Sequence, residues 1–224
     1  MPQYVDYAEY YDWDHGFSDD IPFYLEYAEE AGSPILELAC GTGRILAPLA
    51  VAGHTVHGLD LSENMLAVAR EKIARAGLQD RATLTHADMA DFDLETKGFA
   101  LVFVAFRSFM HLYTQEEQRS CLRNVRDHLR PGGRFIVDVY CPDLEMLTRQ
   151  PDGDFRLVRE FDLPNGHHVV RKDRSVRNDY ANQINHSELL YEEYDASGSP
   201  VRSRTVPMLT RYTFRFEMQL LLES

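Results

Sequence analysis

The sequence predicts an α/β protein built on a doubly wound, mostly parallel sheet, with an inserted antiparallel β-sheet. Short, nearly continuous apolar runs alternate with amphipathic stretches between residues 34 and 141, a pattern typical of a parallel sheet covered by helices on both faces. A glycine-rich turn joins the first run to the first helix. After residue 141 the alternation stops, and polar alternating segments separated by turn residues indicate antiparallel strands.

The first 33 residues are expected to form a separate helical segment. They contain nine acidic and nine aromatic residues but no lysine or arginine. Tyr4, Tyr7 and Tyr11 follow helical spacing, so they predict a first helix. A second helix is expected over residues 20–31, because a proline lies in its first turn and a glycine follows its end.

The central region contains the expected parallel strands and their crossover helices. Ser62 is a good N-cap for one helix, and Thr114 with Glu117 three residues later forms a capping box for another. The expected strands are residues 34–39, 54–59, 82–87, 99–106 and 133–140, and the expected helices are residues 43–52, 62–76 and 114–130.

The last third of the chain is expected to add the antiparallel sheet and a closing helix. Asn-Gly and Ser-Gly pairs mark turns between its strands. The expected strands are residues 155–162, 167–178, 185–195 and 200–213, and the helix is residues 214–222. The predicted organisation is therefore a helical segment (1–33), an α/β core (34–141 plus 214–224) and an inserted antiparallel subdomain (142–213).

Charge and composition argue against several classes of function. The formal net charge is −13, whereas a nucleic-acid-binding protein needs a basic face to neutralise phosphates. No apolar run approaches the roughly 20 residues that span a bilayer, and no export signal opens the chain. Three cysteines without a CxxC pair favour reduced thiols and a cytoplasmic location. The sequence has no metal-ligand pattern.

Gly41 and Gly43 form the first candidate ligand site. The two glycines let the backbone bend sharply and approach a ligand closely, and the following helix presents unpaired N–H groups. A dinucleotide-binding fold would use a similar turn. Leu46 stands where its third glycine or alanine is expected, which argues against a pyrophosphate site.

Two carboxylates follow the next two predicted strands. Asp60 could accept hydrogen bonds from ribose hydroxyls, and Asp88, followed by Met89, could meet an adenine amino group. Because open α/β sheets bind ligands at the carboxyl ends of their strands, these positions should lie near the glycine turn. Each has a purely structural alternative: Asp60 could cap a helix, and Asp88 could cap a turn before Asp91.

Together these motifs resemble those of the class I S-adenosylmethionine-dependent methyltransferases. ELACGTGR, GLDLSENML, HADMADF, AFRSFMHL and LRPGGRFIVDVY occur in the family's order, over roughly residues 7–141. The inserted sheet and the Tyr-Asp segment near the N-terminus resemble the small-molecule N-methyltransferases, among them the amino-sugar N,N-dimethyltransferases. The resemblance implies a Rossmann-like fold, S-adenosyl-L-methionine as cofactor and a small-molecule methyl acceptor.

The resemblance also implies a role for each matched position. Tyr11 would close over the cofactor, which makes residues 1–33 a lid, and His111 would lie near the acceptor amine; these two are the candidate catalytic residues. Packing alone could also explain both. The implied cofactor-binding residues are Glu37, Gly41, Gly43, Asp60, Leu61, Asp88, Met89 and Ala105, and the implied substrate-binding residues are Phe106 and Arg107.

The expected function is methyl transfer from S-adenosylmethionine to a small molecule, at an amine nitrogen. One alternative is O-methylation or carboxyl methylation of a small acid, since Arg107 could bind an anion. Another is a cofactor-binding protein without turnover. In relatives the last helix leads into a β-hairpin, so truncation or a homodimer is expected at this edge of the sheet.

Overall fold

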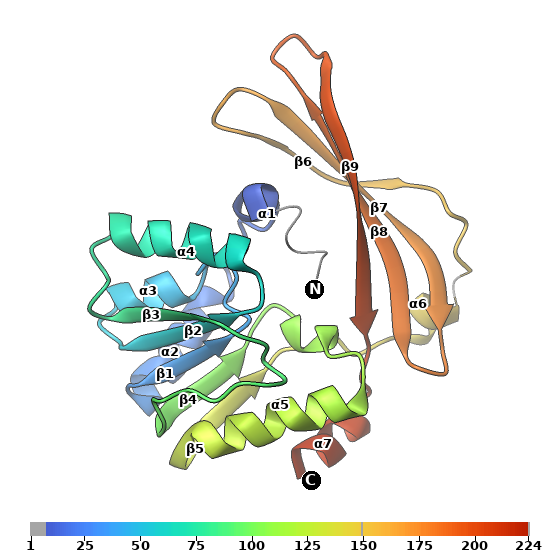
Figure 1. The fold of residues 1–224 in the computed structure, drawn as a ribbon. Coiled ribbons are helices and arrows are strands. Elements are labelled where there is room, and N and C mark those ends of the chain that lie inside the picture. The colour runs from blue at the N-terminus through green and yellow to red at the C-terminus, as the bar shows by residue number, and fades with distance from the viewer. Residues whose placement is uncertain (1–7, 149, 224) are drawn as a thin grey trace.

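The structure, a computed structural model, describes residues 8–148 and 150–223. It contains a five-stranded parallel sheet and a separate four-stranded antiparallel sheet (Figure 1), so the predicted fold class is confirmed. In chain order the elements are α1 (Ala8–Asp14), α2 (Ile21–Ala31), β1 (Ile35–Leu38), α3 (Leu46–Val51), β2 (Val56–Asp60), α4 (Glu63–Arg75), β3 (Ala82–His86), β4 (Phe99–Val104), the 3-10 helix η2 (Ser108–His111), α5 (Gln115–His128), β5 (Leu129–Val137), α6 (Leu144–Thr148), β6 (Arg156–Asp162), β7 (His168–Asp179), β8 (Ile184–Tyr194), β9 (Pro200–Arg211) and α7 (Arg215–Glu223).

The parallel sheet has the strand order β3-β2-β1-β4-β5. Every residue of β1 and β4 is buried, because helices cover both faces of these central strands. Ile35, Leu101 and Phe103 pack toward α2, α3 and α4, while Leu36 and Val102 pack toward α5 and α7. The chain order reverses between β1 and β4, and open α/β sheets bind their ligands at such a switch point.

Both predicted helix caps are present. The Ser62 hydroxyl accepts a hydrogen bond from the Met65 amide at 3.3 Å. Thr114 and Glu117 exchange the two bonds of a capping box, at 2.8 and 3.1 Å. These bonds satisfy amide groups that the first turn of each helix leaves unpaired. The two motifs therefore start α4 and α5 where the sequence predicts.

Strand β5 starts earlier than the predicted 133–140. It begins at Leu129, which pairs with Phe99 before the register shifts along β4. An ideal Cβ on Gly133 would lie 2.9 Å from the Phe99 carbonyl oxygen, so only glycine allows this close backbone approach. The glycines expected to end the preceding helix instead form an irregular start to the strand.

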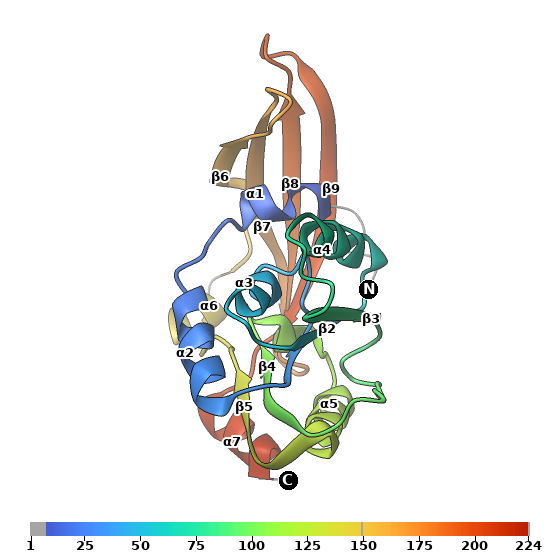
Figure 2. The ribbon, with the colours of Figure 1, turned by 90° about the vertical axis from the view of Figure 1, so that its left-hand side faces the viewer.

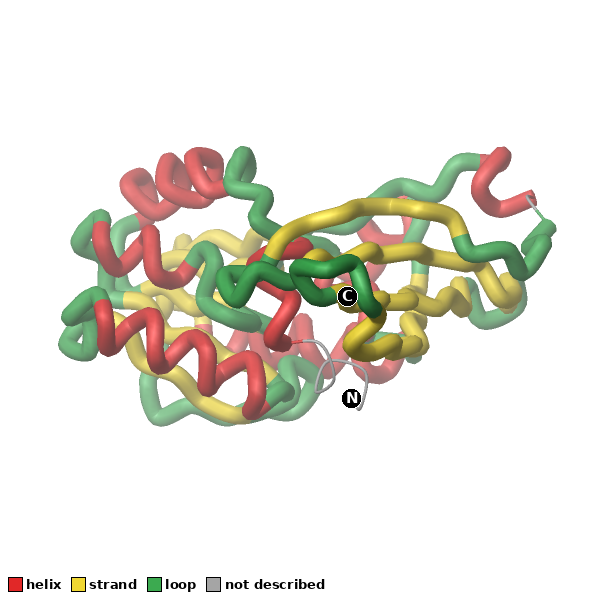
Figure 3. Tube along the Cα trace, turned by 90° about the horizontal axis from the view of Figure 1, so that it is seen from above, coloured by secondary structure: helices red, strands yellow, loops and turns green. Residues whose placement is uncertain are grey.

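The antiparallel sheet has the strand order β6-β7-β8-β9, close to the four predicted segments. Figures 1 and 3 show it beside the parallel sheet, with most of the helices packed around the latter. Its inner face contributes Val169, Leu189 and Val206 to a cluster that also contains Tyr10 of α1 and Met65 of α4. Within the described ranges, no helix has the length and apolarity required to cross a bilayer.

Helix α1 connects the two sheets, lying between α4 and the antiparallel strands in Figure 2. Toward the core, Asp12 accepts a hydrogen bond from Thr42 (2.6 Å) and pairs with Lys72 (2.6 Å). Toward the antiparallel sheet, Asp14 accepts from the hydroxyl of Tyr191 at 2.6 Å. Tyr4 and Tyr7, which predicted the first helix together with Tyr11, lie outside the described residues.

Candidate functional site

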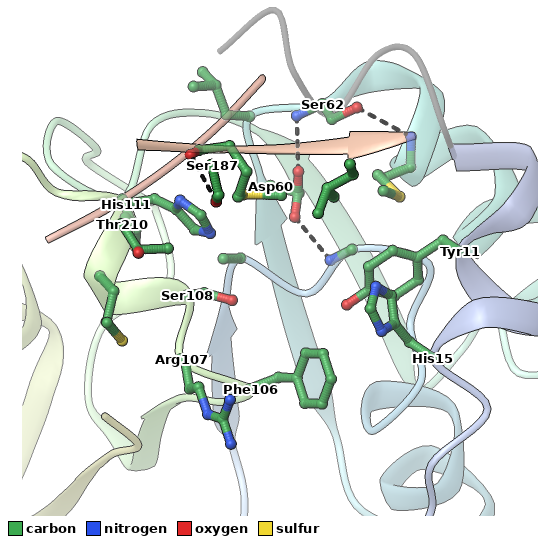
Figure 4. Close-up of a pocket in the computed structure, with 18 of the residues that line it drawn as sticks. Tyr11, His15, Asp60, Ser62, Phe106, Arg107, Ser108, His111, Ser187 and Thr210 are labelled. Carbon is green, nitrogen blue, oxygen red and sulfur yellow. Dashed lines mark hydrogen bonds between the residues drawn. The ribbon is translucent and has the colours of Figure 1, made fainter. Parts of the chain in front are cut away.

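A cavity of about 300 Å3 lies between the carboxyl ends of the parallel strands and the inner face of the antiparallel sheet. Figure 4 shows its walls: Tyr11 and His15 on one side, Asp60 near the centre, and His111 with Thr210 on the other side. The predicted site residues that line it are Tyr11, Gly41, Asp60, Leu61, Asp88, Met89, Phe106, Arg107 and His111. Glu37, Gly43 and Ala105 do not line the cavity.

Asp60 joins the ends of two neighbouring strands. One carboxylate oxygen accepts from the Gly41 amide at 2.8 Å, and the other accepts from the Ser62 amide at 2.7 Å. Burial raises the pKa of Asp60, and these backbone bonds counteract part of that rise. Each oxygen can still accept a second hydrogen bond, so the carboxylate could hold ribose hydroxyls. The capping alternative does not hold, because Ser62 itself caps α4.

Glu37, in the middle of β1, is a buried carboxylate whose Oε2 has no hydrogen-bond partner among the described residues. Burial raises its pKa to about 8, although the charge of Arg44 opposes the rise. A buried polar atom without a partner is uncommon and costly in a native protein. An ammonium group would satisfy this oxygen, which is the chemistry of a cofactor with an amino-acid moiety, but Glu37 itself does not line the cavity.

Asp88 caps a turn, as one of its alternatives predicted, and the residue also lines the cavity. Its side chain accepts from the Ala90 amide at 2.8 Å and so caps a short turn that ends at Asp91. It also lines the cavity together with Met89, which is buried. The turn cap therefore fixes this carboxylate at the edge of the cavity rather than removing it from the site.

The loop after β4 directs His111 into the cavity. Phe106 and Arg107 have φ values of 52° and 64°, in the left-handed region, which turns the chain sharply into η2. Nδ1 of His111 lies 3.0 Å from the carbonyl oxygen of Leu209 on β9. A carbonyl only accepts, so Nδ1 carries the hydrogen and Nε2 of the neutral ring is an acceptor. Burial lowers the pKa of His111 to about 4, which keeps the ring neutral at pH 7.

Arg107 lies at the junction of this cavity and a second, more polar one of about 580 Å3. Its guanidinium lies 6.0 Å from the centre of the Tyr140 ring. Among the residues that the structure describes, none forms an ion pair with Arg107. Arg156 and Arg174, in the wall of the second cavity, are instead paired with Asp152 and Glu188. Arg107 is thus a cation available to an anionic group of a ligand.

Several cavity residues were not predicted from the sequence, among them His15, Arg171, Asp173 and Thr210. Arg171 donates to Asp14 on α1 at 2.8 Å and also pairs with Asp173. One pattern could have identified the β7 residues. Positions 169, 171 and 173 share one face of the strand, and the apolar Val169 marks that face as the buried one.

The comparison with known families agrees with this geometry. Residues 35–133 match the family model described as "Methyltransferase domain". The chain contains a methyltransferase domain. The match begins at β1 and ends within β5, so it includes the glycine turn, Asp60, Asp88 and the loop with His111.

Individual methyltransferases are similar to larger parts of the chain. The chain is 37% identical over 124 residues to dTDP-3-amino-3,6-dideoxy-alpha-D-glucopyranose N,N-dimethyltransferase of Streptomyces fradiae, covering 55% of this chain and 46% of that protein. It therefore spans about half the length of this curated relative. The CcbJ methyltransferase of Streptomyces caelestis has a TM-score of 0.76 and 27% identity, covering 99% of this chain and 85% of the other.

A third similar protein was solved with its cofactor. CalS10, an amino pentose methyltransferase from Micromonospora echinaspora, was solved with S-adenosylmethionine bound; it has a TM-score of 0.69 and 27% identity, covering 92% of this chain and 82% of the other. The fold of the chain is thus similar to that of S-adenosylmethionine-dependent methyltransferases, and residues 35–133 match a methyltransferase domain. The predicted resemblance to this family is confirmed.

Proposed function

We propose that this protein transfers a methyl group from S-adenosylmethionine to an amine nitrogen of a small, sugar-like molecule. The observation that carries the proposal is a single cavity that joins Asp60 and the Gly41 turn to a neutral histidine, His111. The similarity to an amino-sugar N,N-dimethyltransferase and to an amino pentose methyltransferase supports an amine acceptor.

The cofactor half of the cavity would be formed by residues at the ends of β1, β2 and β3. Asp60 would hold the ribose, Asp88 and Met89 the adenine, and Glu37 the amino group of the methionine moiety. When bound, the cofactor supplies a methyl group already activated on a sulfonium, so the protein mainly aligns the acceptor and excludes water. A Cβ built on Gly41 would lie 4.0 Å from Cε1 of the Tyr11 ring, so Tyr11 would cover this half of the cavity.

His111 would orient the acceptor amine. Its Nε2 accepts an N–H hydrogen, which directs the nitrogen lone pair toward the methyl group. A ring with a pKa of about 4 is too weak a base to deprotonate an ordinary ammonium group. The acceptor must therefore reach the site as the neutral amine, and the proton released after transfer leaves with the product or through solvent.

The acceptor half of the cavity offers hydroxyl groups and an aromatic ring. Ser108, Ser187 and Thr210 line it, and Tyr140 lies where the two cavities meet. Side-chain hydroxyls can pair with the hydroxyls of a sugar ring, and an aromatic ring can pack against its apolar face. Arg107 would bind an anionic group on the acceptor.

The remaining sequence-based proposals concern the organisation of the chain. Residues 1–33 would act as a lid, residues 34–141 with 214–224 as the cofactor-binding core, and residues 142–213 as the acceptor side. A cytoplasmic location is proposed from the three cysteines, all free. A homodimer is proposed because β5 is an edge strand of the described sheet.

The first test measures cofactor binding and then acceptor choice. Calorimetric titration with S-adenosylhomocysteine should show binding that Asp60→Ala abolishes, with no binding of NAD. A panel of amino sugars, carboxylic acids and phenols should then show methyl transfer to amines. Transfer only to carboxylates or phenols would support the second candidate, methylation of a small acid, which the unpaired Arg107 favours. Cofactor binding without transfer to any acceptor would support a protein without turnover.

A further inference from the structure

Three aromatic rings line one wall of the cavity and contact each other in series. The ring centres of Tyr11 and His15 are 4.8 Å apart, and those of His15 and Phe106 are 5.2 Å apart. The His15 ring is inclined by 59° and 68° to its two neighbours. Figure 4 shows Tyr11 and His15 together on the side of the cavity where Phe106 also lies. The three rings therefore form a bent wall rather than a flat stack.

This wall connects the two halves of the site. Tyr11 lies next to Gly41 in the glycine turn, and Phe106 begins the loop that leads to His111. The reactive sulfonium of S-adenosylmethionine is a cation, and aromatic rings attract cations through their π faces. We propose that His15 completes an aromatic cage with Tyr11 and Phe106 that binds the sulfonium, so that the site prefers S-adenosylmethionine over the uncharged S-adenosylhomocysteine.

The cage requires His15 to be uncharged, and its surroundings provide this. Burial lowers the pKa of His15 to about 4, against the opposing effect of Asp14 on α1, whose Oδ2 lies 3.5 Å from Nε2. Arg171 on β7, Arg159 on β6 and Arg44 after the glycine turn also disfavour a positive ring. At neutral pH, His15 therefore offers a π face without a charge of its own.

Two of the three arginines near His15 are paired with carboxylates, which offset part of their repulsion of a cation. Arg44 binds Asp20 through two hydrogen bonds, at 2.5 and 2.7 Å, and also lies 5.1 Å from the centre of the Phe106 ring. Arg171 pairs with both Asp14 and Asp173. Arg159 donates to the backbone carbonyl of Asp14.

The test compares the affinities of the charged cofactor and the uncharged product, so it does not depend on the acceptor. Both ligands are titrated calorimetrically into the full chain at pH 7.5, into His15→Ala and into His15→Phe. His15→Ala should lower the affinity for S-adenosylmethionine by about 10-fold and the affinity for S-adenosylhomocysteine by less than about 2-fold. His15→Phe keeps a neutral ring and should restore the preference. Circular dichroism checks that each variant is folded.

Two controls distinguish the cage from a general loosening of the site. Trp13→Ala removes an exposed aromatic residue of α1, the helix that ends just before His15; Trp13 does not line the cavity, so both affinities should stay unchanged. If His15→Ala lowered the affinity for both ligands equally, or lowered neither affinity, the proposed cage would be wrong. The inference rests on the proposed cofactor position, which Asp60→Ala tests separately: if that variant weakens neither ligand, the cofactor position itself is wrong.

Discussion

His111 illustrates how one backbone contact can define the chemistry of a side chain. The Leu209 carbonyl assigns the hydrogen to Nδ1, and burial keeps the ring neutral. The Leu209 carbonyl lies on β9, 98 residues away in the chain, and its hydrogen bond raises the pKa against the larger effect of burial. The resemblance implied a histidine beside the acceptor, but the sequence contained no signal for the tautomer, which depends on a contact between distant segments, or for the pKa, which depends on burial in the folded chain.

The lowered pKa of His111 predicts a pH-dependent stability. The unfolded chain binds a proton near the ordinary pKa of 6.5, whereas the folded chain resists it until about 4, so stability is present above pH 6.5 and is lost as the pH falls. Between pH 7 and 5.5 this residue should account for about 1 kcal/mol of the loss. Urea unfolding at both pH values should show a smaller loss in His111→Gln. An identical loss in both proteins would contradict the shifted pKa.

Arg107 is expected to matter for the acceptor and not for folding. It is exposed and no described residue forms an ion pair with it, and asparagine tolerates its left-handed backbone. Arg107→Asn should therefore change the free energy of unfolding by less than about 0.5 kcal/mol. With an anionic acceptor, KM should rise by about 10-fold while the affinity for S-adenosylhomocysteine stays the same. An unchanged KM would remove Arg107 from the acceptor site.

At the scale of elements, local patterns predicted most of the fold. Apolar runs identified the buried strands β1 and β4, and the capping signals at Ser62 and Thr114 marked two helix starts. The start of β5 was misplaced because Gly132 and Gly133, which often end a helix, here allow a strand to pass close to β4. Glycine is compatible with a helix end and with a close strand pairing, so the pairing with β4 could not be predicted from the local sequence.

Helix α1 is the element whose function is hardest to derive from local sequence. Its seven residues could be read only as an acidic, aromatic helix. Asp14 and Arg171 are separated by 157 positions, so no local pattern could predict their ion pair. The same holds for His15, whose place in the site depends on where this helix docks.

Breaking the contact between α1 and β7 should loosen the site. Asp14 has a fully buried carboxylate that binds both Arg171 and Tyr191. Asp14→Asn removes the charge opposite Arg171 and should cost about 2 kcal/mol of stability, below the usual cost of breaking a buried pair because Asp173 remains. Affinity for S-adenosylhomocysteine should also fall. Urea unfolding and calorimetry measure both effects, and Asp19→Asn, at an exposed position, should change neither.

At the scale of the whole molecule, the cavity is formed jointly by two sheets. The parallel sheet was predicted together with its ligand edge, because the switch point follows from the strand order. The inserted sheet was expected to form part of the acceptor pocket, but the residues that β7, β8 and β9 contribute were not predicted, since the docking of one sheet against another depends on side chains all over both surfaces. The acceptor half of the site was therefore less predictable than the cofactor half.

A ligand held by both sheets should stabilise the whole fold. At a concentration 100 times its Kd, S-adenosylhomocysteine should add about 2.7 kcal/mol, which corresponds to a rise in Tm of roughly 5–10 °C for a chain of this size. Differential scanning calorimetry should show one transition that moves as a unit. The Tm of the Asp60→Ala variant should not rise when S-adenosylhomocysteine is added under the same conditions. Two transitions, of which only one moves, would show that the sheets unfold independently.

The contacts of α1 also determine when the site can form during translation. This helix leaves the ribosome before the antiparallel sheet does, and Arg171, Tyr191 and Glu193, which anchor it to that sheet, are 157 to 183 positions later than their partners. At typical rates of translation that interval is on the order of 10–30 s. A nascent chain can thus complete its glycine turn early, but it cannot enclose a methyl donor until β8 has emerged.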